Sequence, residues 1–185
     1  MKKISTVFKK DPNNLALVIS EVNPENQWVI DGEGVAARKW DGTACAVIDG
    51  VPYKRYDVKK GKSVPEGAIP CQEPDEVTGH WPHWVKCDRN NPADKYHWEA
   101  WDKAKEQMVV LDGTYELCGL KINGNNERMD NHLFISHSAS VMVMENRSFE
   151  FIKGFLEVND MEGIVFHHPD GRMAKIRKTD FGIKR

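Results

Sequence analysis

The sequence predicts an α+β fold in which helices flank antiparallel sheets. The first observation is that three Asp-Gly pairs, beginning at Asp49, Asp112 and Asp170, lie between runs of β-prone residues. Asp-Gly favours a hairpin because both central residues of a type I′ turn need positive φ. The second observation is that only two stretches have the apolar spacing of a helix. The length of 185 residues fits one domain with its own core.

The first hairpin is expected to join Ala44–Ile48 to Val51–Tyr56. If Asp49-Gly50 is the whole loop, residue numbers that face each other sum to 99, so Arg55 faces Ala44. Two shorter strand pieces are expected before this hairpin, at Trp28–Ile30 and Val35–Ala37, on either side of a turn at 31–34.

The middle of the chain is expected to hold one helix and a second hairpin. Residues 59–92 are rich in Pro, Gly and charge, which indicates a long excursion from the sheet. Asn91-Pro92 then begins a helix over Ala93–Gln107, and the second hairpin joins Met108–Leu111 to Thr114–Leu120. The remaining predicted elements are a helix over Phe149–Val158 capped by Ser148, and a third hairpin that joins Glu162–His168 to Arg172–Lys178.

The third hairpin is expected to gather charged side chains on one face. If its loop is Asp170-Gly171, facing residue numbers sum to 341, so Lys175 faces Phe166 and Arg177 faces Ile164. Glu162 then shares a face of the hairpin with both cations, because strand side chains alternate. One carboxylate beside two cations suits a divalent metal ion together with a polyphosphate.

The composition limits the class of protein. Lys and Arg number 26 against 28 Asp and Glu, a formal net charge of −2, which argues against binding of nucleic acid by overall charge. The longest apolar run, Leu15–Ile19, is too short for a membrane span, and the charges at 9–11 leave no export signal. The four cysteines form no Cys-x-x-Cys pair, so reduced thiols in a cytoplasm are expected, the host cytoplasm if a virus encodes the chain.

Three segments carry residues suited to catalysis. In chain order they are Lys39-Trp40-Asp41-Gly42-Thr43, the strand segment Tyr115–Gly119 with Glu116, and the last hairpin with Glu162-Gly163-Ile164-Val165 and Lys175-Ile176-Arg177-Lys178. Lys39 ends a predicted strand and precedes a tight Asp-Gly loop that a ligand can approach closely. Only a neutral amine attacks, so a nucleophilic lysine needs nearby cations or a metal ion that lower its pKa. Taken singly, each segment also fits solvated surface charge.

The order of these segments resembles that of the covalent nucleotidyltransferases, the superfamily of nucleic-acid ligases and messenger-RNA capping enzymes. The resemblance covers residues 35–178, and its most specific parts are the K-x-D-G motif at Lys39 and the final K-x-R motif. It implies that residues 1–185 form a single ATP-grasp-like ligase adenylation domain with an insert at about 59–107. Because only seven residues follow Lys178, no OB-fold is expected after it.

The resemblance also implies a role for individual residues. Lys39 would carry the nucleotide as a phosphoramidate, and Glu162 and Asp41 would hold the metal ion. The other nucleotide-binding residues would be Arg55 and Glu116 at the ribose, Phe134 at the purine, and Lys175 with Arg177 at the phosphates. Two positions depart from the pattern: Arg38 stands where many ligases have glutamate, and Arg177 stands where they have lysine.

Within this superfamily, the segments Gly79–Trp84 and His97–Trp101 look like those of small ATP-dependent 5′-3′ RNA ligases of animals and phages. That likeness implies RNA repair, in which 5′-phosphate and 3′-hydroxyl RNA ends are sealed through a lysyl-adenylate and an adenylylated RNA. The implied cofactors are ATP and Mg²⁺, for which Mn²⁺ can substitute. A minimal DNA ligase, an RNA-capping guanylyltransferase and a catalytically inactive nucleotide-binding relative remain alternatives. No oligomeric state is predicted.

Three further groups of residues each allow two interpretations. Cys71, His80, His83 and Cys87 could form a structural zinc site, although their spacing matches no common zinc finger. Trp81, Trp84, Trp98 and Trp101 could stack on RNA, but a spacing of three on a helix favours core packing for the last two. The tail Arg172–Arg185 holds six basic residues against Asp180 and could contact RNA or be solvated.

Overall fold

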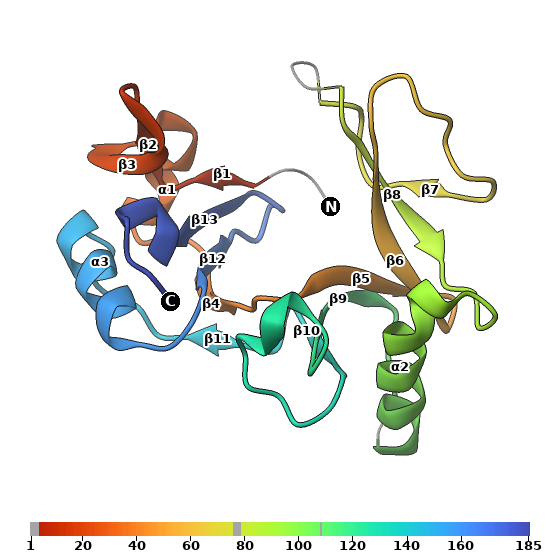
Figure 1. Ribbon diagram of the computed structural model, residues 1–185. Coiled ribbons are helices and arrows are strands. Elements are labelled where there is room, and N and C mark those ends of the chain that lie inside the picture. The colour runs from red at the N-terminus through yellow and green to blue at the C-terminus, as the bar shows by residue number, and fades with distance from the viewer. Residues whose placement is uncertain (1–3, 76–78, 108) are drawn as a thin grey trace. The chain divides into compact units, whose positions relative to one another are not determined.

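A computed structural model describes residues 4–75, 79–107 and 109–185 of the chain (Figure 1). The described residues divide into two compact units, each with its own sheet. Unit 1 is Asp41–His137, and unit 2 consists of residues 4–40 and 138–185. The fold class is mixed α+β, as predicted, and a single adenylation domain with an insert stays a prediction. None of the helices in the described ranges is long and apolar enough to cross a membrane.

Unit 2 is built on a five-stranded sheet. In spatial order its strands are β1 (Ser5–Thr6), β13 (Met173–Arg177), β12 (Gly163–His167), β4 (Val35–Lys39) and β11 (Val141–Met142). β1 runs parallel to β13 and the other neighbours are antiparallel, so this sheet is mixed where antiparallel pairing was expected. A hairpin of β2 (Phe8–Asp11) and β3 (Asn14–Val22), which was not predicted, belongs to the same unit.

The core of unit 2 lies on one face of this sheet. Helix α3 (Phe149–Val158) begins as predicted at Ser148, whose hydroxyl accepts a hydrogen bond from the Phe151 amide at 3.4 Å. Ile152 of α3 is fully buried with Phe166 and other apolar residues of β12 and β13. Burial of each such side chain stabilises the fold by about 1.5–3 kcal/mol. Because strand side chains alternate, Lys175 and Arg177 project from the opposite face.

The segment 28–30 is helical, which corrects the strand prediction. The 3₁₀ helix η1 (Pro24–Asn26) leads directly into α1 (Gln27–Ile30). The Asn23 side chain accepts a hydrogen bond from the Glu25 amide at 3.3 Å, and Pro24 fixes the first helical φ. Trp28 and Val29 are buried all the same, so the apolar run was correctly assigned to the core but to the wrong element.

The third hairpin has a different register from the predicted one. Gly163 pairs with Arg177 and Val165 pairs with Lys175, so facing residue numbers sum to 340, not 341. The loop is one residue longer than expected, because the Gly171 amide donates to the His168 carbonyl at 2.9 Å. A turn that ends in a glycine with positive φ, here 92°, is the usual three-residue hairpin loop. The shift moves both cations off the face of Ile164 and Phe166.

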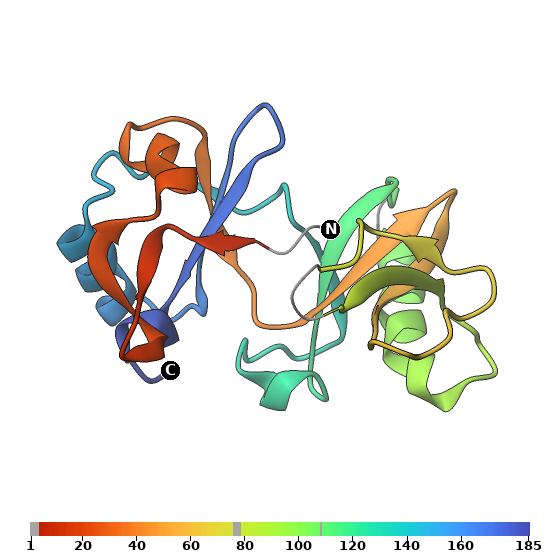
Figure 2. The ribbon, with the colours of Figure 1, turned by 90° about the horizontal axis from the view of Figure 1, so that it is seen from above.

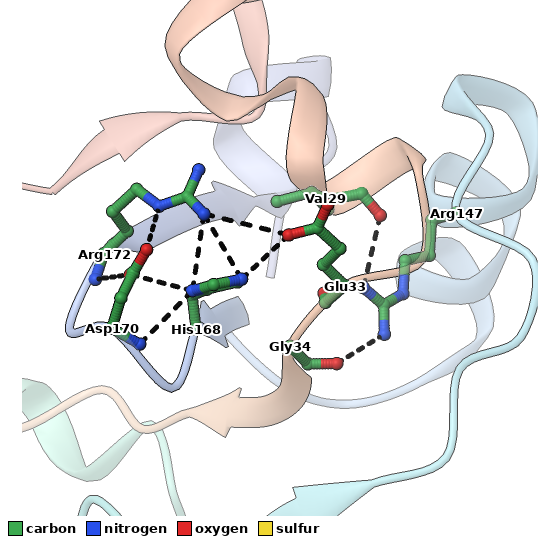
Figure 3. Close-up of polar contacts among 7 residues, drawn as sticks. All are labelled: Val29, Glu33, Gly34, Arg147, His168, Asp170 and Arg172. Atoms are coloured by element: carbon green, nitrogen blue, oxygen red, sulfur yellow. Dashed lines mark hydrogen bonds and ion pairs between the residues drawn. The ribbon is translucent and has the colours of Figure 1, made fainter.

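Charged side chains hold the end of this hairpin (Figure 3). His168 lies between two carboxylates, with Nε2 2.8 Å from Glu33 Oε2 and Nδ1 2.8 Å from Asp170 Oδ1. Hydrogen bonds from the backbone and side chain of Arg172 lower the pKa of the Asp170 carboxyl to about 2. Arg147 donates to the backbone carbonyl of Val29 in α1 and to those of Glu33 and Gly34 in the turn before β4. The hairpin end is therefore tied to the turn that leads into β4.

Unit 1 is built on a six-stranded sheet with one long helix. The strands in spatial order are β10 (Leu133–Ser136), β9 (Gly113–Cys118), β5 (Thr43–Ile48), β6 (Val51–Val58), β8 (Trp81–Lys86) and β7 (Ile69–Pro70). Helix α2 (Lys95–Gln107) follows the 3₁₀ helix η2 (Pro92–Asp94) and packs against β6 and β10 (Figure 2). A further 3₁₀ turn, η3 (Asn123–Asn125), lies between β9 and β10.

The predictions for unit 1 are confirmed in one hairpin and wrong in the other. The β5–β6 pairs sum to 99 as expected, and Asp49 and Gly50 both have positive φ. No hairpin forms across Asp112: residues 109–111 are not a strand, and Met108 lies outside the described residues. β9 pairs instead with β5 and β10. The Asp112 carboxylate accepts hydrogen bonds from the amides of Asp49 and Gly50 at 2.7 and 3.0 Å, so it braces the first turn.

Part of the segment 59–92 belongs to the unit 1 sheet, although the sequence predicted that the segment leaves the sheet. It contributes β7 and β8 to the sheet, because β8 pairs with β6 along its whole length. Trp101 of α2 is 5% exposed, which confirms it as a core residue, whereas Trp98 is only half-buried. Trp84 of β8 is 7% exposed and also lies in the core. Trp98 is stacked by the Arg89 guanidinium, whose carbon lies 3.9 Å from the ring centroid.

Candidate active site

Lys39 lies in a row of residues that crosses three strands of unit 2. It ends β4 and pairs with Gly163 of β12, and Gly163 in turn pairs with Arg177 of β13. Directly opposed residues project to the same face, so Lys39 and Arg177 share a face about 10 Å apart, at two strand spacings. A Cβ on Gly163 would lie 2.3 Å from the Ile176 carbonyl oxygen, so only glycine fits between them.

Lys175 lies on the same face, in the next row of the sheet. It pairs with Val165, which pairs with Ala37 of β4. Burial, followed by the charges of Arg177 and Lys39, lowers the pKa of the Lys175 amine. Among the residues that the structure describes, no carboxylate forms a close ion pair with Lys175, although the charges of Asp180 and Glu162 act on it from farther away. A half-buried cation beside two others lowers its free energy by binding an anion.

Glu162 supplies a carboxylate at the end of this face. Its Oε2 lies 2.5 Å from Lys39 Nζ, and the two side chains are 21% and 24% exposed. Glu162 directly precedes β12, and its carbonyl accepts a hydrogen bond from the Lys178 amide at 2.9 Å. Glu162 therefore reaches the cations from the end of the strand, although the register used to predict this was wrong.

A buried carboxylate that sequence analysis did not single out holds Arg177. Asp180, in the 3₁₀ helix η4 (Lys178–Phe181), is fully buried and accepts hydrogen bonds from Arg177 Nη2 at 2.9 Å and from Lys10 Nζ at 2.7 Å. Burial alone would raise the pKa of the Asp180 carboxyl, but these hydrogen bonds lower it. The only signal in the sequence is the three-residue spacing from Arg177 to Asp180, which is typical of a helix cap.

The basic tail does not present six free charges. Arg172 contacts Asp170, Arg177 contacts Asp180, and Arg185 contacts Asp160. Lys178 is only 7% exposed. Half of the basic residues of the tail are thus paired with carboxylates of unit 2 and a fourth is buried, which disfavours its interpretation as an RNA-binding segment.

In unit 1, the Asp41-Gly42 loop is fixed against β9. The two carboxylate oxygens of Asp41 accept hydrogen bonds from the side-chain amides of Asn123 at 3.0 Å and Asn126 at 2.7 Å. A Cβ on Gly42 would lie 2.4 Å from the Leu117 carbonyl oxygen, so the glycine of the K-x-D-G motif is required by this close approach. The Asp41 carboxylate anchors the loop, and its metal-binding role stays a prediction.

Glu116 and Arg55 share a face of the unit 1 sheet. Glu116 pairs with Ala44, and the β5–β6 register continued by one residue puts Arg55 opposite Ala44. Each charge has a neighbour: Glu116 Oε2 lies 2.9 Å from His137 Nε2, and Arg55 Nε lies 3.0 Å from Asp57 Oδ1.

Phe134 does not join Glu116. It pairs with Leu117, the residue after Glu116 in β9, so the alternation of the strand directs it to the opposite face. There it packs with Leu117 in the core beside α2, and its ring centroid lies 6.5 Å from that of Trp101. The structure therefore places the partly buried Phe134 against this core, on the face away from Glu116, and its stacking on a purine stays a prediction.

Lys39, Glu162, Lys175 and Arg177 together form what we call the cationic face of unit 2. It carries three cations and one carboxylate, on a sheet whose other side is the apolar core. The excess positive charge suits a polyanion, and the amine of Lys39 lies beside an acid that can accept a proton or bind a hard metal ion. Sequence analysis gave a role to all four residues but none to Gly163, Asp180 or Lys10, which hold them in place.

Comparison with known proteins gives two similar sequences, and no protein-family model matches the chain. RNA ligase 1 of Pongo abelii is 28% identical over 66% of this chain and 49% of its own length. RNA ligase 1 of Rattus norvegicus is 26% identical over 80% of this chain and 67% of its own length. The chain thus spans about half to two thirds of the length of these relatives.

Proposed function

We propose that this chain, a distant homologue of animal RNA ligase 1, is an ATP-dependent RNA ligase that joins 5′-phosphate and 3′-hydroxyl ends. The observation that supports this proposal is the cationic face. On it, the Lys39 amine contacts Glu162, and Lys175 and Arg177 lie on the same face of the sheet. An amine nucleophile, phosphate-binding cations and a metal-binding carboxylate are the parts that formation of a lysyl-adenylate needs.

In the first step, the Lys39 ammonium gives up its proton to solvent, and Nζ, which lies 2.5 Å from Glu162 Oε2, attacks the α-phosphorus of ATP. The Glu162 carboxylate stays ionised and can still hold a metal ion. A P–N bond forms, the bond from the α-phosphorus to the bridging oxygen breaks, and pyrophosphate leaves. Lys175 and Arg177 bind phosphate oxygens and neutralise the charge that develops on the leaving group. Lys175 does so without giving up an ion pair to any described carboxylate.

In the second step, an oxygen of the RNA 5′-phosphate attacks the α-phosphorus of the lysyl-adenylate. The P–N bond breaks, the Lys39 amine is regenerated, and the adenylyl group is carried by the RNA end. In the third step, a 3′-hydroxyl attacks the 5′-phosphorus, so a phosphodiester bond forms and AMP leaves. All three steps depend on positioning and charge neutralisation, which a rigid sheet face supplies.

The donor set at Glu162 fits a magnesium ion. Carboxylate oxygens are the ligands that Mg²⁺ prefers, and the Glu162 side chain is 21% exposed and accessible from solvent. When bound there, Mg²⁺ or Mn²⁺ would supply positive charge that polarises phosphate oxygens. Asp41 as a further metal ligand, and Arg55 and Glu116 as ribose-binding residues, stay predictions within this proposal.

The test is covalent labelling. The chain is incubated with Mg²⁺ and with ATP or GTP labelled at the α-phosphate, then denatured and examined for attached label. We expect acid-labile labelling by ATP that disappears in Lys39→Ala and persists in Lys86→Ala, an exposed lysine at the end of β8. Absence of label from the folded wild-type chain with either nucleotide would favour an inactive nucleotide-binding relative.

The substrate is tested with the labelled chain. Addition of RNA with a 5′-phosphate and a 3′-hydroxyl is expected to move the label to RNA and then to release AMP with formation of a joined product. Joining of DNA in preference to RNA would indicate a minimal DNA ligase. Labelling by GTP with transfer to a 5′-diphosphate end would indicate a capping enzyme.

A further inference from the structure

Unit 1 contains a buried cluster of three different metal-ligating side chains, apart from the residues discussed above. Cys87 follows β8, Asp94 ends η2, and His97 lies in the first turn of α2. Their ligand atoms all lie within 4.8 Å of one another. The three residues are 3%, 1% and 8% exposed, so the cluster is enclosed by protein. Within the described parts of the chain, no other set of this kind is found.

His97 gives independent evidence that something is missing from this cluster. Both of its ring nitrogens are buried and have no hydrogen-bond partner. A buried polar atom without a partner costs about 1–3 kcal/mol, so native proteins rarely leave one unpaired. A bond from one ring nitrogen to a metal ion removes that cost at the nitrogen, and neutral imidazole is among the commonest metal ligands.

We propose that Cys87, Asp94 and His97 bind a zinc ion. A thiolate, an imidazole and a carboxylate are all ligands of zinc, whereas Mg²⁺ and Ca²⁺ take oxygen ligands. Three protein ligands leave the fourth tetrahedral position to a water molecule. The ion would join the end of β8 to the start of α2, which is the helix that covers the unit 1 sheet.

The state of the thiol bears on how the ion binds. Burial, followed by the charge of Asp94, raises the pKa of the Cys87 thiol to about 12, so without an ion the sulfur keeps its proton. Formation of the zinc–sulfur bond breaks the S–H bond and releases one proton to solvent, and binding is therefore tighter at higher pH. The Lys54 ammonium, which contacts the Asp94 carboxylate, competes with the ion for that ligand.

This cluster differs from the zinc set considered from the sequence. Cys71, His80 and His83 do not gather with Cys87, and the His83 Nδ1 atom already lies 2.9 Å from the Trp81 carbonyl oxygen. The spacing from Cys87 through Asp94 to His97 matches no common zinc motif, so no sequence pattern indicates this cluster.

The test uses cobalt as a spectroscopic substitute for zinc. The full-length chain is stripped with a chelator, checked for folding by circular dichroism, and titrated with Co²⁺. We expect one equivalent to bind with a sulfur-to-cobalt charge-transfer band, and one equivalent of Zn²⁺ to abolish that band. Cys87→Ser is expected to lose the band, and the control Cys71→Ser to keep it.

His97→Gln provides the second variant, in case Cys87→Ser does not fold. It is expected to weaken Co²⁺ binding by more than roughly a hundredfold, because loss of even a residue that only orients a ligand costs about 10- to 100-fold. The proposal is overturned if the folded wild-type chain shows no charge-transfer band, if the band survives in folded Cys87→Ser, or if Cys71→Ser abolishes it. None of these readouts depends on nucleotide labelling.

Discussion

Each unit contains a lysine paired with a carboxylate, and the two pairs differ in their surroundings. In unit 2, Lys39 contacts Glu162, and in unit 1, Lys54 contacts Asp94. Both lysine side chains are 24% exposed, but Glu162 is 21% exposed whereas Asp94 is 1% exposed. Asp94 also accepts a hydrogen bond from the Asp88 amide at 2.9 Å, so its carboxylate is fixed on both oxygens.

The neighbours of each pair indicate what it does. Lys39 and Glu162 lie beside Lys175 and Arg177, an excess of positive charge that favours an anion. Lys54 and Asp94 lie beside the thiol of Cys87 and the imidazole of His97, which carry no positive charge of their own when neutral. A lysine–carboxylate pair is thus proposed to serve phosphate chemistry in unit 2 and a structural or metal-binding role in unit 1.

The largest expected difference between the two pairs is in nucleotide transfer. Arginine keeps the positive charge and the carboxylate contact, but a guanidinium does not lose its proton and cannot attack phosphorus. We expect Lys39→Arg to reduce the rate of labelling by ATP by about 10⁴-fold or more, as loss of a nucleophile does. Lys54→Arg is expected to label at nearly the wild-type rate. If both variants lose the same amount of labelling rate, then the different neighbours of the two pairs do not give them different roles.

Folding stability should show the reverse order. Lys54→Met leaves the buried Asp94 carboxylate without its cation, and such a change costs roughly 3–5 kcal/mol. Lys39→Met removes a partly exposed pair whose contribution is about 0–1 kcal/mol. Denaturant unfolding of the two variants measures both free energies of unfolding. If Lys39→Met proves as destabilising as Lys54→Met, then the Lys39 pair has a structural role that its exposure does not suggest.

Lys175 tests the difference further, because it is the cation of the cationic face that forms no close ion pair with a described carboxylate. A hydrogen bond between charged groups contributes about 1.5–3 kcal/mol, so Lys175→Met is expected to lower labelling at limiting ATP by roughly 10- to 150-fold. The control is Lys184→Met in the same basic tail, which should label normally. A loss confined to saturating ATP, with no change at limiting ATP, would contradict a phosphate-binding role.

Sequence-based predictions were most accurate for turns and helix ends, whose structure depends on adjacent residues. Asp49-Gly50 fixes the register of its hairpin because both residues accept positive φ, and Ser148 marks the start of α3. The third hairpin was missed by one residue because Pro169 begins its turn earlier than the Asp-Gly pair suggests. The prediction of a hairpin across Asp112 was wrong for a different reason. Its carboxylate binds the amides of a turn 62 and 63 residues away, and no local pattern contains that contact.

The candidate site shows the same limit. The order of the motifs identified Lys39 and Glu162, which lie 123 positions apart and contact each other. It could not identify Asp180 as the residue that positions Arg177, because the second cation on that carboxylate, Lys10, comes from 170 positions away. The order of the motifs also could not show that Phe134 lies against the core, because the alternation that directs it there depends on its pairing with Leu117.

The smallest expected effect concerns the pH dependence of stability around Lys54 and Asp94. Burial is the main cause that lowers the pKa of His97, so the folded chain keeps this imidazole neutral while the unfolded chain takes up a proton below pH 6.5. The unfolded state then binds more protons, and the free energy of unfolding falls on acidification by at most about 1.4 kcal/mol per pH unit. Denaturant unfolding between pH 7 and 5, with a chelator present, should show a slope that is reduced in His97→Gln and unchanged in His80→Gln, whose histidine is exposed. A slope unaffected by His97→Gln would mean that the imidazole becomes protonated in the folded chain, and the cluster would then resemble the charged face of unit 2 more than the neutral site described here.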